Sequence, residues 1–278
     1  PCYYAGGHLL VLSGSSVISW GTATVPAGLF DITAVAAGRD LSGASHYLAL
    51  RSNGTVAIWG YDPYAEGFLT PPAPLSNVVA IKAGDRTSLA LKSDGTVVAW
   101  GNNQYGQSSP PAGLAQVIAI AAGRKLSVAL KLDGTVVAWG DPLVATPPAG
   151  LSNVVAIAAG DAHALALKAD GTVVAWGDNN YGQTTLPAGL SDIMAIAAAQ
   201  SHSVALKSDG TAMTWGFDNS GPPNSTPASL VAGTGVTAIA ATPGTNVLRK
   251  PGGVVQILPS ICCVANFSEY FDPAWWSY

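Results

Sequence analysis

The chain has 278 residues, of which 49% are hydrophobic and only 10% are charged, and its formal net charge is −4. Soluble domains average about 25% charged residues, so Ser, Thr, Asn, Gln and Gly must cover much of this surface. No Lys/Arg cluster is present, which argues against nucleic acid and anionic lipid as partners. No apolar run reaches the roughly 18–20 residues of a membrane span.

The two ends of the chain carry all of its cysteines. Cys2 lies at the start, and Cys262 and Cys263 lie near the end. Cysteines that can bridge indicate an oxidising compartment, so we expect a secreted or extracellular protein from which a signal peptide was removed before Pro1. Three unpaired buried thiols are the alternative.

A repeat of about forty residues runs along the chain. The dipeptide Trp-Gly begins at residues 20, 59, 100, 139, 176 and 215, so successive copies are 37 to 41 residues apart. The segment 252–257 forms a seventh, degraded copy. Self-similarity at such a period is the signature of a repeat architecture.

One unit, residues 153–183, shows the internal organisation of the repeat. Three short β-rich runs are expected at 153–159, 163–167 and 172–176, with a weaker fourth between 183 and 187. Asp170-Gly171 joins the second and third runs, and Asp-Gly between apolar runs predicts a β-hairpin because Gly tolerates positive φ. No segment has a sustained 3.6-residue apolar period, so almost no helix is expected.

Seven copies of such a unit predict an all-β protein. One unit buries only part of its apolar surface, so neighbouring units must stack, and radial stacking gives a seven-bladed β-propeller over residues 1–267. The Trp of each unit is large enough to wedge between blades. An open β-solenoid is the alternative architecture, but its parallel ladders fit the hairpin turns poorly.

The ring is expected to close by pairing of its N- and C-terminal strands, because an open propeller would leave an edge strand. The apolar segment 261–267 would lie beside the first blade. Cys2 would then form a disulfide with either Cys262 or Cys263.

Several units share a run of motifs: Ala-Ala-Gly, His-x-x-Ala-Leu, Asp-Gly-Thr-Val, Trp-Gly and Pro-Ala-Gly-Leu. These motifs resemble the repeat family of the regulator of chromosome condensation, most closely its short bacterial branch, which includes the β-lactamase inhibitory propeller. The resemblance covers roughly residues 1–257 and implies a seven-bladed propeller that binds other proteins with one face. It also implies eukaryotic relatives that act as nucleotide-exchange factors on a small GTPase and bind chromatin.

The inhibitory relatives carry aromatic residues in the loop after the first strand. This chain has Arg86, Lys125, Ala162 and Ser201 there instead. The difference argues against β-lactamase inhibition.

Two sets of loops are expected on one face of the ring. Because the strands of a blade alternate in direction, the loops after the first and third strands share one face, and the Asp-Gly turns lie on the other. We name these the loop face and the turn face. The turns are nearly uniform, which is typical of a structural role. The loops vary between blades, so function is expected on the loop face.

The predicted partner-binding residues belong to these loops. After the first strands they are Arg39, Asp40, Asp85, Arg86, Arg124, Lys125, Asp161 and Gln200; after the third strands they are Tyr61, Tyr64, Tyr105, Tyr181 and Phe217. Arg and Tyr are enriched at protein interfaces, although an ordinary solvated rim is the alternative. The two loops of the second blade, residues 39–45 and 61–68, are longer than their counterparts and are the first place to look.

The sequence offers little that points to catalysis or cofactors. All four histidines, His8, His46, His163 and His202, occupy one repeat position, which favours a structural role over a ring of metal ligands. No unique carboxylate pair, phosphate-cradling loop or zinc spacing is present. We therefore expect no enzyme activity, no cofactor and no metal.

A short tail, residues 268–278, follows the repeats. Its aromatic residues are Tyr270, Phe271, Trp275, Trp276 and Tyr278. The tail is expected to pack on its own propeller or on a neighbouring subunit, which would give a homo-oligomer or a filament.

The leading hypothesis is a secreted, non-enzymatic propeller that binds a protein or surface partner through its loop face. The alternatives are a structural subunit of an extracellular assembly joined through the tail, and a carbohydrate-binding lectin.

Overall fold

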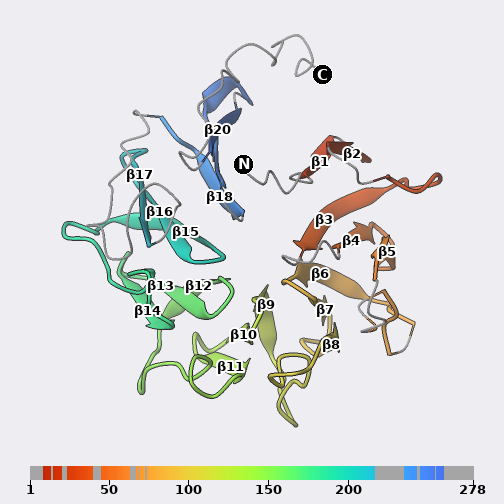
Figure 1. The fold of residues 1–278 in the computed structure, drawn as a ribbon, viewed down its shortest axis with the longest axis horizontal. Coiled ribbons are helices and arrows are strands. Elements are labelled where there is room, and N and C mark those ends of the chain that lie inside the picture. Colours follow the sequence, from red (N-terminus) through yellow and green to blue (C-terminus); the bar gives the residue numbers. More distant parts are fainter. Residues whose placement is uncertain are drawn as a thin grey trace, which may run out of the picture.

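The computed structural model describes residues 9–13, 15–20, 24–39, 45–62, 67, 69–72, 74–216, 235–242, 245–253 and 255–259. These residues form seven antiparallel sheets that follow one another around a central axis (Figure 1). Among the described residues the only helix is a single turn, Pro251–Gly253. The prediction of an all-β, seven-bladed propeller is confirmed, and the alternative of a β-solenoid is wrong.

The first sheet contains two described strands and each of the others three. In chain order they are β1 Leu9–Ser13 and β2 Ser16–Trp20; β3 Ile32–Arg39, β4 Ser45–Arg51 and β5 Val56–Tyr61; β6 Val78–Ala83, β7 Thr87–Lys92 and β8 Val97–Gly101; β9 Val117–Ala122, β10 Leu126–Lys131 and β11 Val136–Gly140; β12 Val154–Ala159, β13 His163–Lys168 and β14 Val173–Gly177; β15 Ile193–Ala199, β16 His202–Lys207 and β17 Ala212–Gly216; β18 Ala238–Thr242, β19 Thr245–Arg249 and β20 Val255–Pro259. The runs expected in the unit 153–183 match β12, β13 and β14 to within one residue.

The expected fourth strand of the unit is wrong. Residues 183–185 form a turn and a bend, residues 186 and 187 belong to no strand, and each blade after the first has three described strands. The side chain of Gln183 explains the difference, because its Oε1 accepts a hydrogen bond from the Tyr181 backbone N and holds the chain in a loop. The strands and cysteines expected to close the ring, and the aromatic tail, lie outside the described residues.

In four repeats the Trp packs between blades, as predicted, at Trp100, Trp139, Trp176 and Trp215. Trp139 of β11 shares a cluster with Leu89 and Leu91 of the preceding blade and with Val117 and Ile120 of its own inner strand. Trp176 and Trp215 occupy equivalent clusters one and two blades further on. Each of these four inter-blade cores therefore contains one large ring, and burial of such rings dominates core energetics.

The Asp-Gly turns join each blade to the next. In the turn at Asp170, the carboxylate accepts hydrogen bonds from the backbone N and the hydroxyl of Thr172 at 3.0 and 2.6 Å. Gly171 has φ +80°, which only Gly adopts at little cost, and its carbonyl accepts a hydrogen bond from Ile193 N at the start of the next blade. The turn therefore fixes both its own hairpin and the entry to the following inner strand.

Glycines at the ends of the inner strands let the blades approach one another closely. A Cβ on Gly123 would overlap the Gly160 carbonyl of the next blade, and one on Gly160 would overlap the Ala199 carbonyl. Because the neighbouring atoms belong to the backbone, they cannot move aside. The recurrence of Gly at the end of the Ala-Ala-Gly motif therefore has a steric cause, because a side chain there would overlap the backbone of the next blade.

Candidate protein-binding face

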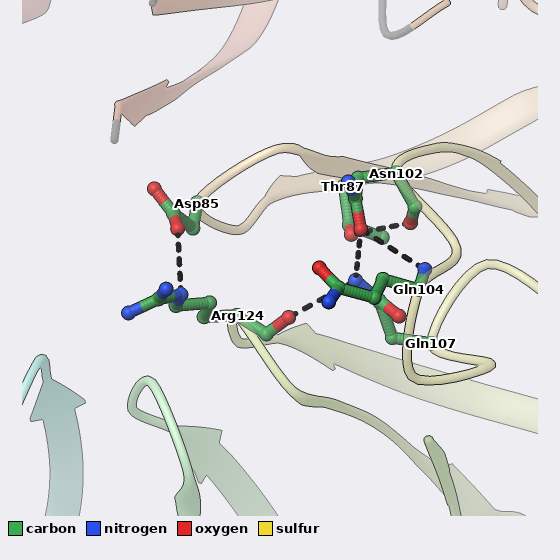
Figure 2. A network of polar contacts seen from close by, with 6 residues as sticks. All are labelled: Asp85, Thr87, Asn102, Gln104, Gln107 and Arg124. Atoms are coloured by element: carbon green, nitrogen blue, oxygen red, sulfur yellow. Dashed lines mark hydrogen bonds and ion pairs between the residues drawn. The ribbon is translucent and has the colours of Figure 1, made fainter. Parts of the chain in front are cut away.

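The loops after the first and third strands lie together, as the alternation of strand direction predicts. Asn102, after β8, donates its backbone N–H to the Arg86 carbonyl of its own blade at 2.9 Å. Gln107, from the same loop, donates Nε2–H to the Arg124 carbonyl of the next blade at 3.1 Å. Figure 2 shows these loops meeting around Gln107. The loop face is thus a continuous surface that crosses blade boundaries.

A buried glutamine organises the third-strand loops of two blades. Gln107 and Gln183 end the matching sequences Tyr105-Gly106-Gln107 and Tyr181-Gly182-Gln183, and both side chains are buried. The Gln107 carbonyl accepts hydrogen bonds from Trp139 Nε1 at 2.8 Å and Ser127 Oγ at 2.9 Å, both from the next blade. These bonds hold each loop on the neighbouring blade, so the residues at its tip are carried on a rigid base.

An ion pair with Asp85 holds Arg124 in place on the loop face. Its Nε lies 3.3 Å from Asp85 Oδ2, and Asp85 belongs to the inner-strand loop of the preceding blade. Figure 2 shows the Nε side of the guanidinium turned to Asp85, while the far end points away from the other labelled residues. The Arg124 side chain is 47% exposed against 13% for Asp85. The carboxylate therefore orients the guanidinium and leaves its outer end at the surface.

Lys125 continues this charged surface toward the outside of the ring. Its Nζ lies 5.2 Å from the centroid of the Tyr105 ring, in cation–π geometry, and 3.8 Å from Asp141 Oδ2. The contact joins the third-strand loop of one blade to the inner-strand loop of the next. Aromatic, cationic and acidic groups thus meet within one patch.

Asp161 lies in the inner-strand loop of the blade that follows Arg124, whereas Asp85 lies in that of the blade before it. The Asp161 carbonyl accepts hydrogen bonds from the backbone N atoms of Arg124 and Lys125, and the N–H of Asp161 donates to the Gln200 carbonyl. Burial raises the pKa of Asp161, and the positive charge of Arg124 opposes that rise. Successive inner-strand loops are therefore linked by backbone hydrogen bonds and by the attraction between Arg124 and Asp161.

The remaining predicted residues are spread around the same face. Tyr61 ends β5 and is well exposed, Tyr181 is exposed at the tip of its loop, and Arg39 ends β3. Asp40, Tyr64 and Phe217 lie outside the described residues, as does most of both second-blade loops. Among the described residues, blades three to five bring the predicted groups together most closely.

One residue of this patch was missed from the sequence. Leu143, in the loop after β11, is 89% exposed. This loop lacks the Tyr-Gly-Gln motif, and Val144 and Ala145 are buried in its place, so Leu143 is pushed outward. The absence of the Tyr-Gly-Gln motif from this loop was the feature of the sequence that could have indicated the exposed Leu143. We name Tyr105, Arg124, Lys125, Leu143 and Tyr181 the binding patch.

The three histidines of the repeat position that the structure describes, His46, His163 and His202, are buried, and His8 lies outside the described residues. His163 Nε2 lies 3.0 Å from Ser203 Oγ of the next blade. Since Ser203 Oγ donates its hydrogen to the Gln183 carbonyl, the imidazole must donate from Nε2. Burial lowers the pKa of His163 to about 3 and that of His46 to about 4, so both are neutral at physiological pH. The position is structural, as the repetition predicts, but its side-chain partner belongs to the neighbouring blade.

No group of three or more His, Cys, Asp or Glu side chains is placed to hold a metal ion within the part of the chain that the structure describes. No helix in the described part is long and apolar enough to cross a membrane.

The fold and this face define a repeat protein of the β-propeller class. Within it, residues 78–107 and 154–183 match the regulator of chromosome condensation (RCC1) repeat, so the chain carries RCC1 repeats. The resemblance expected from the motifs is confirmed. A comparison of the sequence with curated proteins gives no match.

Solved propellers share the fold. Prp20p from Saccharomyces cerevisiae, described with its binding to Gsp1p and histones, is 23% identical, with a TM-score of 0.65 over 82% of this chain and 72% of its own. Human WBSCR16 is 16% identical, with a TM-score of 0.65 over 88% of this chain and 79% of its own. The ectodomain of the Arabidopsis thaliana receptor kinase ACR4 is 18% identical, with a TM-score of 0.62 over 82% and 85%. At these identities the likeness shows the fold alone.

Proposed function

We propose that this chain is a secreted, non-enzymatic scaffold that binds a protein partner through its loop face, with the binding patch as the centre of contact. The observation that carries the proposal is the arrangement of Arg124. A guanidinium oriented by Asp85, with its outer end at the surface and Tyr105 and Leu143 on neighbouring loops, is the combination found at interface hot spots.

The rigidity of the patch favours binding. Gln107 ties the Tyr105 loop to the next blade, and Asp85 restrains Arg124 before any partner arrives. Ordering flexible side chains on association costs about 0.5–1.5 kcal/mol each, so residues that are already positioned keep more of their contact energy. A partner with a carboxylate would pair with the outer end of the guanidinium.

The similar solved structures support a binding role. Prp20p is described with its binding to Gsp1p and histones, and another structure holds the yeast RCC1 protein Prp20 bound to Kap60. Proteins of this fold therefore present surfaces to other proteins. For this chain we propose the same general use of the fold with a partner of its own.

Site-specific photo-cross-linking tests the proposal. A photoreactive amino acid replaces Leu143 in the full chain, and a second sample carries it at Leu132, which is exposed on the turn face. After irradiation in extract from the native source, we expect a protein adduct from position 143 that excess unlabelled chain suppresses. An adduct pattern identical at both positions, or no saturable adduct at 143, would overturn the assignment of the loop face.

Substitutions then locate the contact on the partner so identified. Arg124→Ala and Tyr105→Ala should each weaken binding about tenfold or more, as expected for central interface residues. Lys131→Ala is the matched control, because Lys131 lies in the same blade but in a turn on the opposite face. Equal losses for Arg124→Ala and Lys131→Ala would contradict the proposed patch.

A further inference from the structure

Exposed apolar side chains gather on the turn face, where uniform turns had suggested only a structural role. Ten large hydrophobic residues of the described chain are exposed, and six of them belong to this face. They are Phe30, Val79, Ile118, Leu132, Val155 and Met194, with exposures between 51% and 69%. Solvated surfaces usually scatter such residues singly, so this concentration requires an explanation.

Four of the six occupy one repeat position in successive blades. Val79, Ile118, Val155 and Met194 are the second residues of β6, β9, β12 and β15, which contact one another around the axis (Figure 1). We name these four residues the apolar arc. At each of them the pairing with the second strand skips one residue, as between Val154 and Ala156. The β-bulge leaves that residue unpaired and exposes its side chain.

The fold does not require an apolar residue at this position. The flanking blades carry Thr33 and Thr237 instead. Thr33 Oγ1 donates to the Leu50 carbonyl at 3.3 Å, and Thr237 Oγ1 donates to the Arg249 carbonyl at 3.2 Å. A small polar side chain therefore finds a local hydrogen-bond partner at this repeat position, and at Thr33 it does so within the same β-bulge. Four adjacent apolar residues in its place do not stabilise the isolated ring and point to a partner.

The rim around the apolar arc contains both charges, with one Lys and one Asp from each turn and a further exposed carboxylate at Asp192. In blades three to six every turn contains Lys-x-Asp, and two of these pairs are in contact: Lys131 with Asp133 at 3.2 Å and Lys168 with Asp170 at 3.3 Å. The carboxylates remain exposed. The Lys-x-Asp turns carry no net charge that would attract a strongly acidic or basic partner, but the turns of a second copy offer a Lys for each of these Asp residues and an Asp for each Lys.

We propose that the apolar arc and its Lys–Asp rim form a two-fold interface between two copies of this chain, joined turn face to turn face. An isologous contact requires a self-complementary patch, and an apolar centre within a rim of alternating charges has this property. Leu132 lies beside the arc, because its N–H donates to the Gln116 carbonyl at the start of the same inner strand. The binding patch of each copy then faces outward on opposite sides of the dimer.

Analytical ultracentrifugation of the full chain across the micromolar range tests the interface. The wild-type chain should have twice the monomer mass of 28.0 kDa and dissociate on dilution. The triple variant Ile118→Thr, Val155→Thr, Met194→Thr copies the residue of the flanking blades and should raise the dimer Kd about tenfold or more. Leu186→Thr, at an exposed apolar residue outside both the apolar arc and the binding patch, is the matched control and should leave the Kd unchanged.

A second variant keeps the arc intact. Lys131→Glu with Lys168→Glu makes the rim acidic without touching the turn carboxylates, so it should weaken the dimer, less so at high salt. Thermal unfolding by circular dichroism checks that each variant folds. A monomeric wild-type chain, an unchanged Kd in both interface variants, or an equal loss in Leu186→Thr would overturn the proposal, and none of these outcomes bears on the binding patch.

Discussion

Trp139 and Trp176 occupy the same position of successive repeats and differ in one hydrogen bond. Both rings are buried to the same extent, with 6% exposed. Trp139 Nε1 donates to the Gln107 carbonyl at 2.8 Å, whereas Trp176 Nε1 is buried without a partner among the described residues. The loop before Trp176 lacks the glutamine, which explains the difference. Replacing each Trp by Phe therefore removes the same apolar atoms, but it removes a favourable hydrogen bond at Trp139 and an unfavourable unpaired N–H at Trp176.

The size of the difference follows from these contacts. Trp139→Phe removes a hydrogen bond of about 1 kcal/mol, because the Gln107 carbonyl keeps its bond from Ser127 Oγ. Trp176→Phe removes an unpaired buried N–H, which costs the native protein about 1–3 kcal/mol. Since the loss of packing is common to both, Trp139→Phe should lower the free energy of unfolding by about 2–4 kcal/mol more than Trp176→Phe does.

Urea unfolding followed by far-UV circular dichroism measures this difference, with midpoints compared at an unchanged slope. Trp215→Phe is the control and should resemble Trp139→Phe, because Trp215 Nε1 donates to the Gln183 carbonyl at 2.9 Å. Equal losses for Trp139→Phe and Trp176→Phe would refute the reasoning, as would a Trp215→Phe protein that behaves like Trp176→Phe.

Three further predictions rest on the contacts between blades. Gly123→Ala places a Cβ against the Gly160 carbonyl and should cost about 1–3 kcal/mol, whereas the reverse change, Ala199→Gly, should cost about 0.5–1 kcal/mol; thermal unfolding compares them. Burial lowers the pKa of His163 from 6.5 to about 3, so as the pH drops below 6.5 the unfolded chain binds a proton that the folded chain does not, and stability falls. The urea midpoint should therefore change less between about pH 7.5 and about pH 5 in His163→Gln than in the wild-type chain. An equal change in the two proteins would contradict this. Gln107→Ala should lose about 1–3 kcal/mol of stability and weaken partner binding through Arg124 and Tyr105, whereas Gln183→Ala should lose similar stability but weaken binding less, because it loosens Tyr181 alone; unfolding and binding assays on the two proteins separate these effects.

Much of the fold could be predicted because the repeat is local. Each Asp-Gly turn, such as Asp170-Gly171, is determined by residues within a few positions, and the apolar alternation around it marks both strands. The Trp-Gly spacing then sets the number of blades. The expected fourth strand failed because Gln183 makes its decisive hydrogen bond with the loop backbone, which apolar alternation does not reveal.

The candidate site could be predicted only as a face. Strand alternation placed Tyr105, Arg124 and Lys125 on the same side, but the ion pair of Arg124 with Asp85 depends on the distance between two blades. Leu143 was missed because its exposure follows from the burial of Val144 and Ala145 beside it. These are properties of neighbours in space rather than of the residue type.

The turn face shows the same division more sharply. The sequence by itself determined that the turns repeat, that Val79, Ile118, Val155 and Met194 share one position, and that this position is apolar in four blades. An apolar residue inside a strand predicts burial. Only the tertiary structure decided otherwise, because a β-bulge between the first two strands of each of these blades takes that residue out of the pairing and leaves its side chain at the surface.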